Sequence, residues 1–340
     1  MRKNNTTRDF ILGVDGGGTK TRAGIADFKG NVLATAVAGP GNFQSIGTAA
    51  AQGEIARAIK KALAAANVDC HQIASTAYGL SGADREKDFD IVAGFLMDIN
   101  PSPHFMLSND TTLILRAGTT NGVGVASVAG TGSNTMGFNE KGDHVKVGGY
   151  GPYSGDSGGS YDLSSKAIIA AWKGMDGRGP KTMIEDMLCV ALGLDDLADI
   201  IEFTYFDSFN PDIHLNEYTP MVFDAAKKGD KVAVRILHQT GRECADDILS
   251  CMRRLFKDKT RAVPIVLGGS IYQKGVSPAL VNAVEQKVRK IYPKVKLVRL
   301  KSEPCVGAML LAMDNHLGKP TPAAVRRRII KTFAHAMDCE

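Results

Sequence analysis

The chain lacks the patterns that mark metal-binding, secreted and membrane proteins. Its six cysteines are scattered and form no C-x-x-C pair, which excludes the common zinc spacings. Scattered cysteines in a chain of 340 residues are typically reduced thiols, so we expect a cytoplasmic protein. The first nine residues are polar and read as a loose tail, and the short apolar run after them is no signal-peptide core. No apolar stretch reaches the length of a membrane span, so we expect no membrane partner.

A strong charge of either sign is also missing. The net charge is +5 and charged residues make up 23% of the chain, as in an ordinary globular protein. The one dense basic cluster, Arg326–Arg328, is typical of a solvated helix face, so we expect no nucleic-acid partner. The length and a hydrophobic content of 44% suffice for a substantial core in two domains.

Hydrophobic periodicity and turn residues predict alternating strands and helices. The predicted strands cover residues 10–15, 21–26, 32–38, 73–80, 105–107, 122–128, 135–138, 144–148, 263–267 and 295–300. The predicted helices cover residues 48–67, 84–99, the stretch from 110 to about 117, 160–173, 181–192, 278–291 and 303–316. Residues 215–256 should hold at least two more helices, broken near Gly229.

One pattern occurs twice. A strand, a glycine turn with threonine, a strand, a turn and a third strand follow one another from residue 10 and again from residue 122. This weak internal repeat predicts two related halves, each opening with a three-stranded antiparallel meander.

The two glycine turns are the first candidates for a ligand site. A strand follows each of them, which excludes a P-loop and a dinucleotide-binding loop, because both of those open a helix. Glycine lets backbone N–H groups approach a phosphate closely, whereas an ordinary hairpin turn needs fewer glycines. Asp15, at the end of the first strand, suits a Mg²⁺ ion held through water. The phosphate candidates are Gly16, Gly17, Gly18, Thr19, Lys20, Gly130, Thr131 and Gly132.

Three motifs together resemble a known superfamily. The stretches at 15–19 (DGGGT), 129–134 (AGTGSN) and 267–270 (LGGS) resemble the two phosphate motifs and the adenosine motif of the actin, hexokinase and heat-shock ATPases. Within that superfamily, residues 10 to about 315 resemble the N-acetylglucosamine kinase group of the BadF/BadG/BcrA/BcrD-type ATPases. The resemblance implies ATP and Mg²⁺ as cofactors. It places Gly268, Gly269 and Ser270 at the adenosine, although a generic strand-to-helix turn is the alternative.

The same resemblance implies the fold. We expect an α/β protein of two ribonuclease-H-like domains, each a mixed five-stranded sheet flanked by helices, with an active-site cleft between them. The first domain should span residues 1–118 and the second 119–320, with a helical insertion at about 160–260. A basic tail at 321–340 should return to the first domain.

Substrate residues also follow from the resemblance. Asp110 matches the family's general base, and a carboxylate can accept a sugar hydroxyl's proton; a helix N-cap is a compatible alternative. Asn42 matches a sugar-binding asparagine, and its alternative is a loop residue that satisfies local backbone. Tyr150 stands where relatives carry tryptophan, which leaves the sugar open. The other matching positions are Ser81, Gly82, Ser133, Asn134, Gly149, Gly151 and Asp156. Ser81-Gly82 also reads as a plain turn, and Asp156 as an N-cap in a flexible glycine-rich loop.

We therefore predict an ATP-dependent sugar kinase that makes N-acetylglucosamine 6-phosphate. Glucosamine, N-acetylmuramic acid or another hexose are alternative acceptors. An activator of 2-hydroxyacyl-CoA dehydratases would need cluster-binding cysteines in mid-chain, and none lies between Cys70 and Cys189. A sugar-responsive repressor needs a DNA-binding module before the first strand, and nine polar residues cannot form one. A zinc-containing ROK-type kinase would need a cysteine-rich cluster. The partner is then a small-molecule sugar, and the oligomeric state stays open, a homodimer included.

Overall fold

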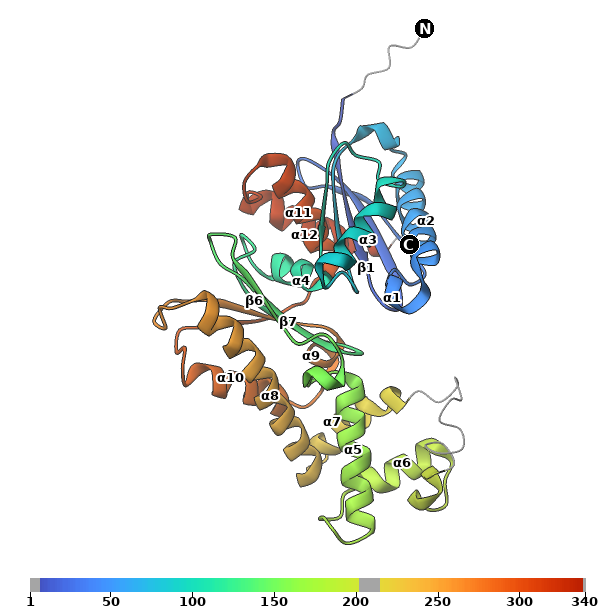
Figure 1. Ribbon diagram of the computed structural model, residues 1–340, viewed down its shortest axis with the longest axis vertical. Helices are drawn as coiled ribbons and strands as arrows, with labels where there is room; N and C mark the ends of the chain where they lie inside the picture. Colours follow the sequence, from blue (N-terminus) through green and yellow to red (C-terminus); the bar gives the residue numbers. More distant parts are fainter. Residues whose placement is uncertain (1–6, 202–214, 339–340) are drawn as a thin grey trace. The chain divides into compact units, whose positions relative to one another are not determined.

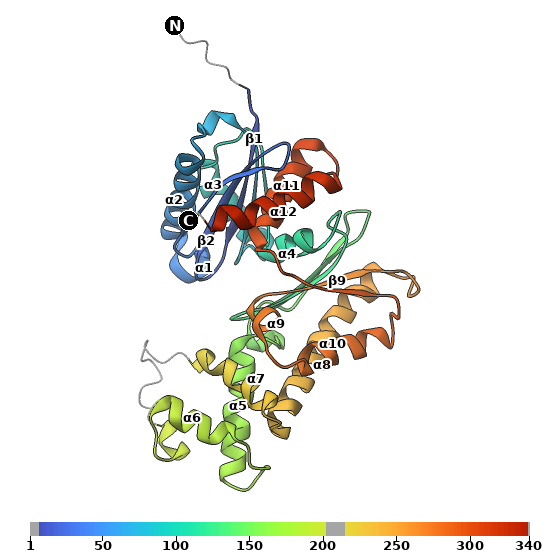
Figure 2. The same cartoon turned by 180° about the vertical axis from the view of Figure 1, so that it is seen from behind.

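The computed structural model describes residues 7–201 and 215–338. Most of the predicted N-terminal tail, and Cys339, lie outside these residues. The chain divides into two compact units (Figure 1, Figure 2). Unit 1 is formed by Met1–Gly124 together with Leu300–Glu340, and unit 2 by Val125–Arg299.

Unit 1 is built on a mixed sheet with strand order β3-β2-β1-β4-β5. Its strands are β1 (Phe10–Gly16), β2 (Thr21–Asp27), β3 (Val32–Ala38), β4 (Ile73–Leu80) and β5 (Phe105–Ser108). The first three form the predicted antiparallel meander, while β4 pairs parallel to β1 and β5 parallel to β4. The end of β1 therefore lies at the centre of the sheet, beside the end of β4.

Helices cover both faces of this sheet because its strands alternate apolar side chains between the faces. On one face, Leu12 and Val14 join a core completed by α2 (Thr48–Ala66) and α3 (Glu86–Met97). On the other, Ile11 packs with α4 (Asp110–Gly118), α11 (Pro304–Leu317) and α12 (Ala323–Met337). The short helix α1 (Phe43–Ile46) contacts α2.

Helix α11 lies directly on the first sheet, although the chain reaches it only after unit 2 (Figure 2). A Cβ atom on Gly13 would come within 2.4 Å of the backbone nitrogen of Met309, so bare strand backbone lets the helix approach. This placement differs from the predicted second domain of residues 119–320. Residues 305–313 of α11 are all buried, and such an apolar pattern does not tell which of two sheets a helix covers. Helix α12, from the basic tail, contacts β3.

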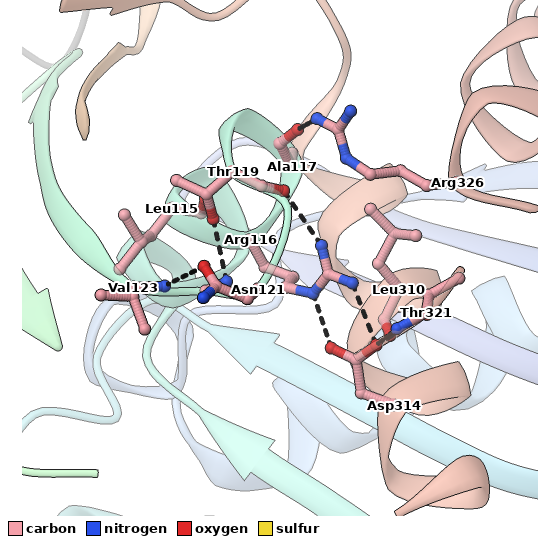
Figure 3. Close-up of polar contacts among 11 residues, drawn as sticks. Leu115, Arg116, Ala117, Thr119, Asn121, Val123, Leu310, Asp314, Thr321 and Arg326 are labelled. Atoms are coloured by element: carbon pink, nitrogen blue, oxygen red, sulfur yellow. Dashed lines mark hydrogen bonds and ion pairs between the residues drawn. The ribbon is translucent and has the colours of Figure 1, made fainter. Parts of the chain in front are cut away.

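A buried ion pair joins α4 to α11 (Figure 3). Arg116, only 1% exposed, donates to both carboxylate oxygens of Asp314 at 2.6 and 2.9 Å, and to the carbonyl of Thr119 at 3.1 Å. Asp314 also accepts the backbone N–H of Thr321 (2.7 Å) and its hydroxyl (2.6 Å). Arg326 of α12 donates to a carbonyl of α4 at 2.7 Å. The contact between the first two helices is the Arg116–Asp314 ion pair.

Unit 2 repeats the strand arrangement of unit 1. Its strands are β6 (Gly124–Ala129), β7 (Ser133–Phe138), β8 (His144–Val147), β9 (Pro264–Gly268) and β10 (Lys296–Arg299), in the order β10-β9-β6-β7-β8. Strands β7 and β8 are antiparallel, and β9 is parallel to both β6 and β10. Each predicted strand corresponds to one of these ten, and the two mixed five-stranded sheets confirm the predicted fold class.

The helices of unit 2 include the predicted insertion. They are α5 (Ser160–Met175), α6 (Ile184–Leu192), α7 (Thr219–Lys227), α8 (Lys231–Leu255), α9 (Ser270–Lys274) and α10 (Ala279–Arg289). The break between α7 and α8 falls at Gly229, which has a positive φ of 92°. Short 3₁₀ turns occupy Cys70–Gln72, Pro152–Ser154, Leu197–Ile200 and Leu215–Tyr218.

Two further observations concern the whole described chain. The five cysteines within it are all free thiols. None of its helices combines the length and the apolar run that crossing a bilayer requires.

Candidate functional site

The first glycine turn is held by bonds from two neighbouring loops. The N–H of Gly17 donates to the carbonyl of Lys20 at 2.9 Å and closes the turn between β1 and β2. The carbonyl of Gly16 accepts from Ser81 at 2.8 Å, and that of Gly17 accepts from Gly41 at 2.9 Å. The predicted phosphate turn and the predicted Ser81 loop are therefore adjacent in unit 1.

Some glycines in the two turns have no packing reason to be glycine. A Cβ atom on Gly18, Gly130 or Gly132 would meet no atom of the described residues within 4 Å, and none of the three has a left-handed φ. Gly16 is different, because a Cβ there would lie 2.5 Å from the side chain of Leu80. The bare backbone at the three open positions is thus available to a ligand, and a nucleotide phosphate fits it.

Carboxylates gather behind the first turn. Asp15 is half-buried, and burial, followed by the charges of Asp110 and Glu303, raises its pKa to about 7, against the opposing charges of Lys20 and Arg22. The ammonium of Lys20 lies 3.5 Å from a Glu303 oxygen. Such a group of acids suits a divalent cation, whose charge would restore the ionised form of Asp15. Sequence reasoning missed Glu303, which no motif marks.

Asp110 does not fill the N-cap position that was its alternative role. The N-cap of α4 is Asn109, whose side-chain oxygen accepts from the N–H of Thr111 at 3.0 Å. Its amide donates to Asp84 at 2.9 Å. Asp110 is the first residue of the helix and is half-buried, close enough to Asp15 to raise the pKa of that residue.

Asn42 and Gly82 are neighbours in unit 1. The side-chain oxygen of Asn42 caps α1 by accepting from the N–H of Gln44 at 2.9 Å, so its predicted local role is real. The amide of Gln44 donates to the carbonyl of Gly82, also at 2.9 Å. Gly82 has a φ of 88°, and a Cβ there would lie 2.5 Å from the Asn42 oxygen. Gln44, which the sequence analysis did not single out, thus joins the two predicted substrate loops.

The second glycine turn rests on the beginning of α5. The N–H of Gly130 donates to the carbonyl of Gly132 at 2.9 Å, and the carbonyl of Gly130 accepts from Ser160 at 2.8 Å. A Cβ on Gly159 would lie 2.8 Å from the backbone of Gly132. Gly269, with a φ of 90°, lies against the end of β6, where a Cβ would be 2.3 Å from a carbonyl oxygen. The predicted phosphate and adenosine motifs of unit 2 therefore adjoin.

A pocket of about 350 Å³ opens beside these two motifs. Thr131 and Ser270 line it from the motifs themselves, Phe223 and Ile271 contribute apolar walls, and Glu217 contributes a carboxylate. Apolar walls with a few polar groups are typical of pockets for small molecules. A larger groove of about 850 Å³ follows β3 in unit 1, but none of the predicted site residues lines it.

Asp156 organises the glycine-rich segment after β8. Its carboxylate accepts the N–H groups of Gly149 and Gly151 at 2.9 and 2.8 Å, and the hydroxyl of Ser154 at 2.6 Å. A Cβ on Gly149 would lie 2.9 Å from the side chain of Asn134, so the segment adjoins the second turn. The N-cap alternative for Asp156 is wrong, because the N-cap of α5 is a glycine.

The aromatic ring at the tryptophan position is exposed. Tyr150 is 56% exposed, and the ammonium of Lys146 lies 3.9 Å from its ring centroid. One face of the ring is therefore occupied by a cation–π contact, and the other is the face on which a sugar could stack. Ser133 and Asn134, the two polar candidates before it, begin β7.

Helix α8 adds two carboxylates that sequence reasoning missed. Glu243 accepts the hydroxyl of Ser157 at 2.8 Å, at the far end of the glycine-rich segment. One turn later, burial raises the pKa of Asp247 to about 7, assisted by the charges of Asp156, Asp246 and Glu243. In the sequence these acids look like a solvated helix face, since nothing local shows which loop covers them.

Comparisons with known proteins agree on one family. The model of the BadF/BadG/BcrA/BcrD ATPase family matches residues 12–312. An N-acetyl-D-glucosamine kinase of Dictyostelium discoideum is 30% identical over 91% of this chain and 99% of its own length. An N-acetylmuramic acid/N-acetylglucosamine kinase of Clostridium acetobutylicum is 29% identical over 89% of this chain and 98% of its own.

Solved structures agree on the fold. A candidate N-acetylglucosamine kinase from Chromobacterium violaceum superposes with a TM-score of 0.67 at 23% identity, covering 90% of this chain and 99% of that one. A second, from Porphyromonas gingivalis, gives a TM-score of 0.64 at 20% identity with the same coverage.

Proposed function

Because the chain belongs to the BadF/BadG/BcrA/BcrD ATPase family, we propose that it transfers the γ-phosphoryl group of ATP to an amino sugar, with N-acetylglucosamine as the acceptor. Two full-length relatives named as kinases of this sugar support the acceptor. N-acetylmuramic acid is the second candidate, because one of these relatives is also named for it. A reducing compartment such as the cytoplasm suits the free cysteines.

The observation that carries the proposal is the pair of open glycine turns. Each follows the central strand of its sheet, and each leaves backbone uncovered where neither packing nor φ asks for glycine. The backbone of Gly17 to Lys20 and that of Gly130 to Gly132 would each offer N–H groups to phosphate oxygens. The pocket next to Thr131 and Ser270 would receive the adenosine, with Gly268 and Gly269 forming its backbone edge.

A magnesium ion fits the acids of unit 1. Asp15 would hold it through water, with Glu303 close enough to take part. When bound, Mg²⁺ neutralises charge on the phosphates of the nucleotide. Lys20, half-exposed and paired with Glu303, brings a positive charge to the same turn.

Asp110 would act as the general base. Its carboxylate would accept the proton of the sugar hydroxyl as that oxygen attacks the γ-phosphorus, while the bond to the leaving ADP oxygen breaks. The sugar would be oriented by Asn42, Ser81 and Gly82 in unit 1. Ser133, Asn134 and the segment Gly149–Gly151 are the further candidate sugar contacts, with Asp156 holding that segment in shape.

The experiment is ADP release measured against a panel of N-acetylglucosamine, N-acetylmuramic acid, glucosamine and glucose. Asp110→Asn should lower kcat by about 10²- to 10⁴-fold, because it removes the proton acceptor, while ATP affinity stays near wild type. Asp90→Asn, an exposed acid on α3, is the matched control and should keep full activity. If no sugar of the panel raised the rate of ADP release, the sugar-kinase proposal would be refuted. Near-normal turnover of Asp110→Asn would remove Asp110 as the base.

A further inference from the structure

A second pocket in unit 2 is lined by cations. It measures about 350 Å³ and lies between α5 and the first turns of α8. Lys166, Lys173, Arg178 and Arg235 line it, with the apolar Ile236 beside them, and none of the described residues that line it carries a carboxylate. None of the candidate nucleotide or sugar residues lines this pocket, which we call the cationic pocket.

Two of the four cations form ion pairs within the described residues, and the carboxylate of Asp176 also interacts electrostatically with a third, Lys173. The guanidinium of Arg178 bonds the Asp176 carboxylate at 2.7 Å. Within the described part of the chain, the side chains of Lys173 and Arg235 form no ion pair. Lys173 comes from α5 and Arg235 from α8, so positive charge that forms no ion pair flanks the pocket from two helices. A concave site of this kind raises the local concentration of small anions.

Lys166 connects the cationic pocket to an internal network. Its ammonium donates to Asp162 at 2.8 Å, to the hydroxyl of Thr240 at 3.2 Å and to Glu243 at 2.5 Å. An ammonium group has three N–H donors, and all three are in use. An anion in the pocket can therefore engage Lys166 only by replacing one of these contacts.

The two acids bound by Lys166 hold the end of the glycine-rich segment. Asp162 accepts the backbone N–H of Gly158 at 2.9 Å, and Glu243 accepts the hydroxyl of Ser157 at 2.8 Å. The next residue, Gly159, packs on the second glycine turn. A shift of Lys166 would loosen the segment that presents Gly149 and Gly151.

We propose that the cationic pocket binds a phosphate dianion, either free phosphate or the phosphate group of a small monoester, and that the bound anion draws Lys166 away from Glu243. Phosphate suits the pocket because two guanidinium and two ammonium groups are among its lining residues. The effect on the sugar segment rests on the proposed kinase function, whereas binding to the pocket does not.

Binding is tested by calorimetry on the full chain with Mg²⁺ and a saturating non-hydrolysable ATP analogue, so that the nucleotide fills the glycine turns. Inorganic phosphate and glycerol 3-phosphate are titrated separately at low ionic strength, because exposed cations are screened by salt. If the pocket accepts phosphate esters, both ligands should bind saturably. If it accepts only the free ion, inorganic phosphate should bind and glycerol 3-phosphate should not. The double variant Lys173→Met/Arg235→Met should bind at least about 10-fold more weakly, since two charged contacts are lost.

Lys227→Met/Lys228→Met, at the end of α7, removes the same charge outside the pocket and should bind like wild type. Absence of saturable binding, or equal binding by the pocket variant, would overturn the site.

The coupling is tested by kinetics. Phosphate should raise the KM for the acceptor sugar about 3-fold, the effect of losing one partly exposed charged contact, and should leave kcat unchanged. The Lys173→Met/Arg235→Met variant should keep its basal kcat and KM and lose this response. A rise in the KM for ATP that persists in the variant would instead mean competition at the glycine turns and would refute the coupling. If no sugar is phosphorylated, the proposed function fails, while the calorimetry still decides the pocket.

Discussion

Replacing Asp314 by leucine should destabilise unit 1 strongly. Arg116 would keep its buried guanidinium and its contact with Thr119 but lose both bonds to the carboxylate. Thr321 would lose an acceptor for its N–H and its hydroxyl. Removing one partner of a buried pair costs about 3–5 kcal/mol. Since the side chain of Asp314 is 19% exposed, we expect about 3 kcal/mol.

The double variant Arg116→Met/Asp314→Leu should be more stable than Asp314→Leu alone, because it leaves no uncompensated buried charge. Hydrogen exchange of the backbone amides in β1 and β4 measures the loss of stability in unit 1. The amides in β6 and β9 give a reference in unit 2. Asp98→Leu, an exposed acid at the end of α3, is the control and should change protection little. Two results would refute this reasoning. One is a free energy of amide protection in Asp314→Leu that lies within about 1 kcal/mol of the wild-type value, and the other is a double variant that is less stable than the single one.

Two further predictions concern unit 2. Gly132→Ala should leave the unfolding free energy within about 0.5 kcal/mol of wild type, because its Cβ meets no atom, yet weaken nucleotide binding in a direct titration. Unchanged affinity would remove the second turn from the phosphate site. Asp247→Asn tests the raised pKa of that residue. Burial disfavours its ionised form, so wild-type stability should fall as pH rises from about 4 to 7. Above pH 7 the variant should be more stable than wild type by about 2 kcal/mol, and near pH 4 the two proteins should be equally stable. Urea unfolding at both pH values measures this difference. A stability difference that does not change with pH would contradict the prediction.

Local patterns predicted the sheets well because the meanders are local structures. Each pairs neighbouring strands across a short turn, and glycine and alternation mark both features in the sequence. Asn109 and Asp110 show the limit of such reasoning, since both residue types cap helices and only the side-chain geometry assigns the cap to Asn109.

The remaining site residues depend on contacts between distant segments. Glu303 acts on Asp15 only because α11 returns to the first sheet, and Glu243 meets Ser157 only because α8 passes behind the glycine-rich segment. No motif surrounds either glutamate. Asp156 was found as a candidate, but its bonds to two backbone N–H groups could be seen only once the segment was folded.

The return of α11 to the first sheet imposes an order on folding during synthesis. Unit 2 is one continuous stretch of the chain, and the ribosome has synthesised all of it before α11 is made. Until then the face of unit 1 around Ile11 is covered only in part, by α4, because α11 and α12 supply most of the buried residues that pack there. We therefore expect a nascent chain to expose part of this apolar surface while unit 2 is synthesised, which is the interval in which chaperone binding would protect it.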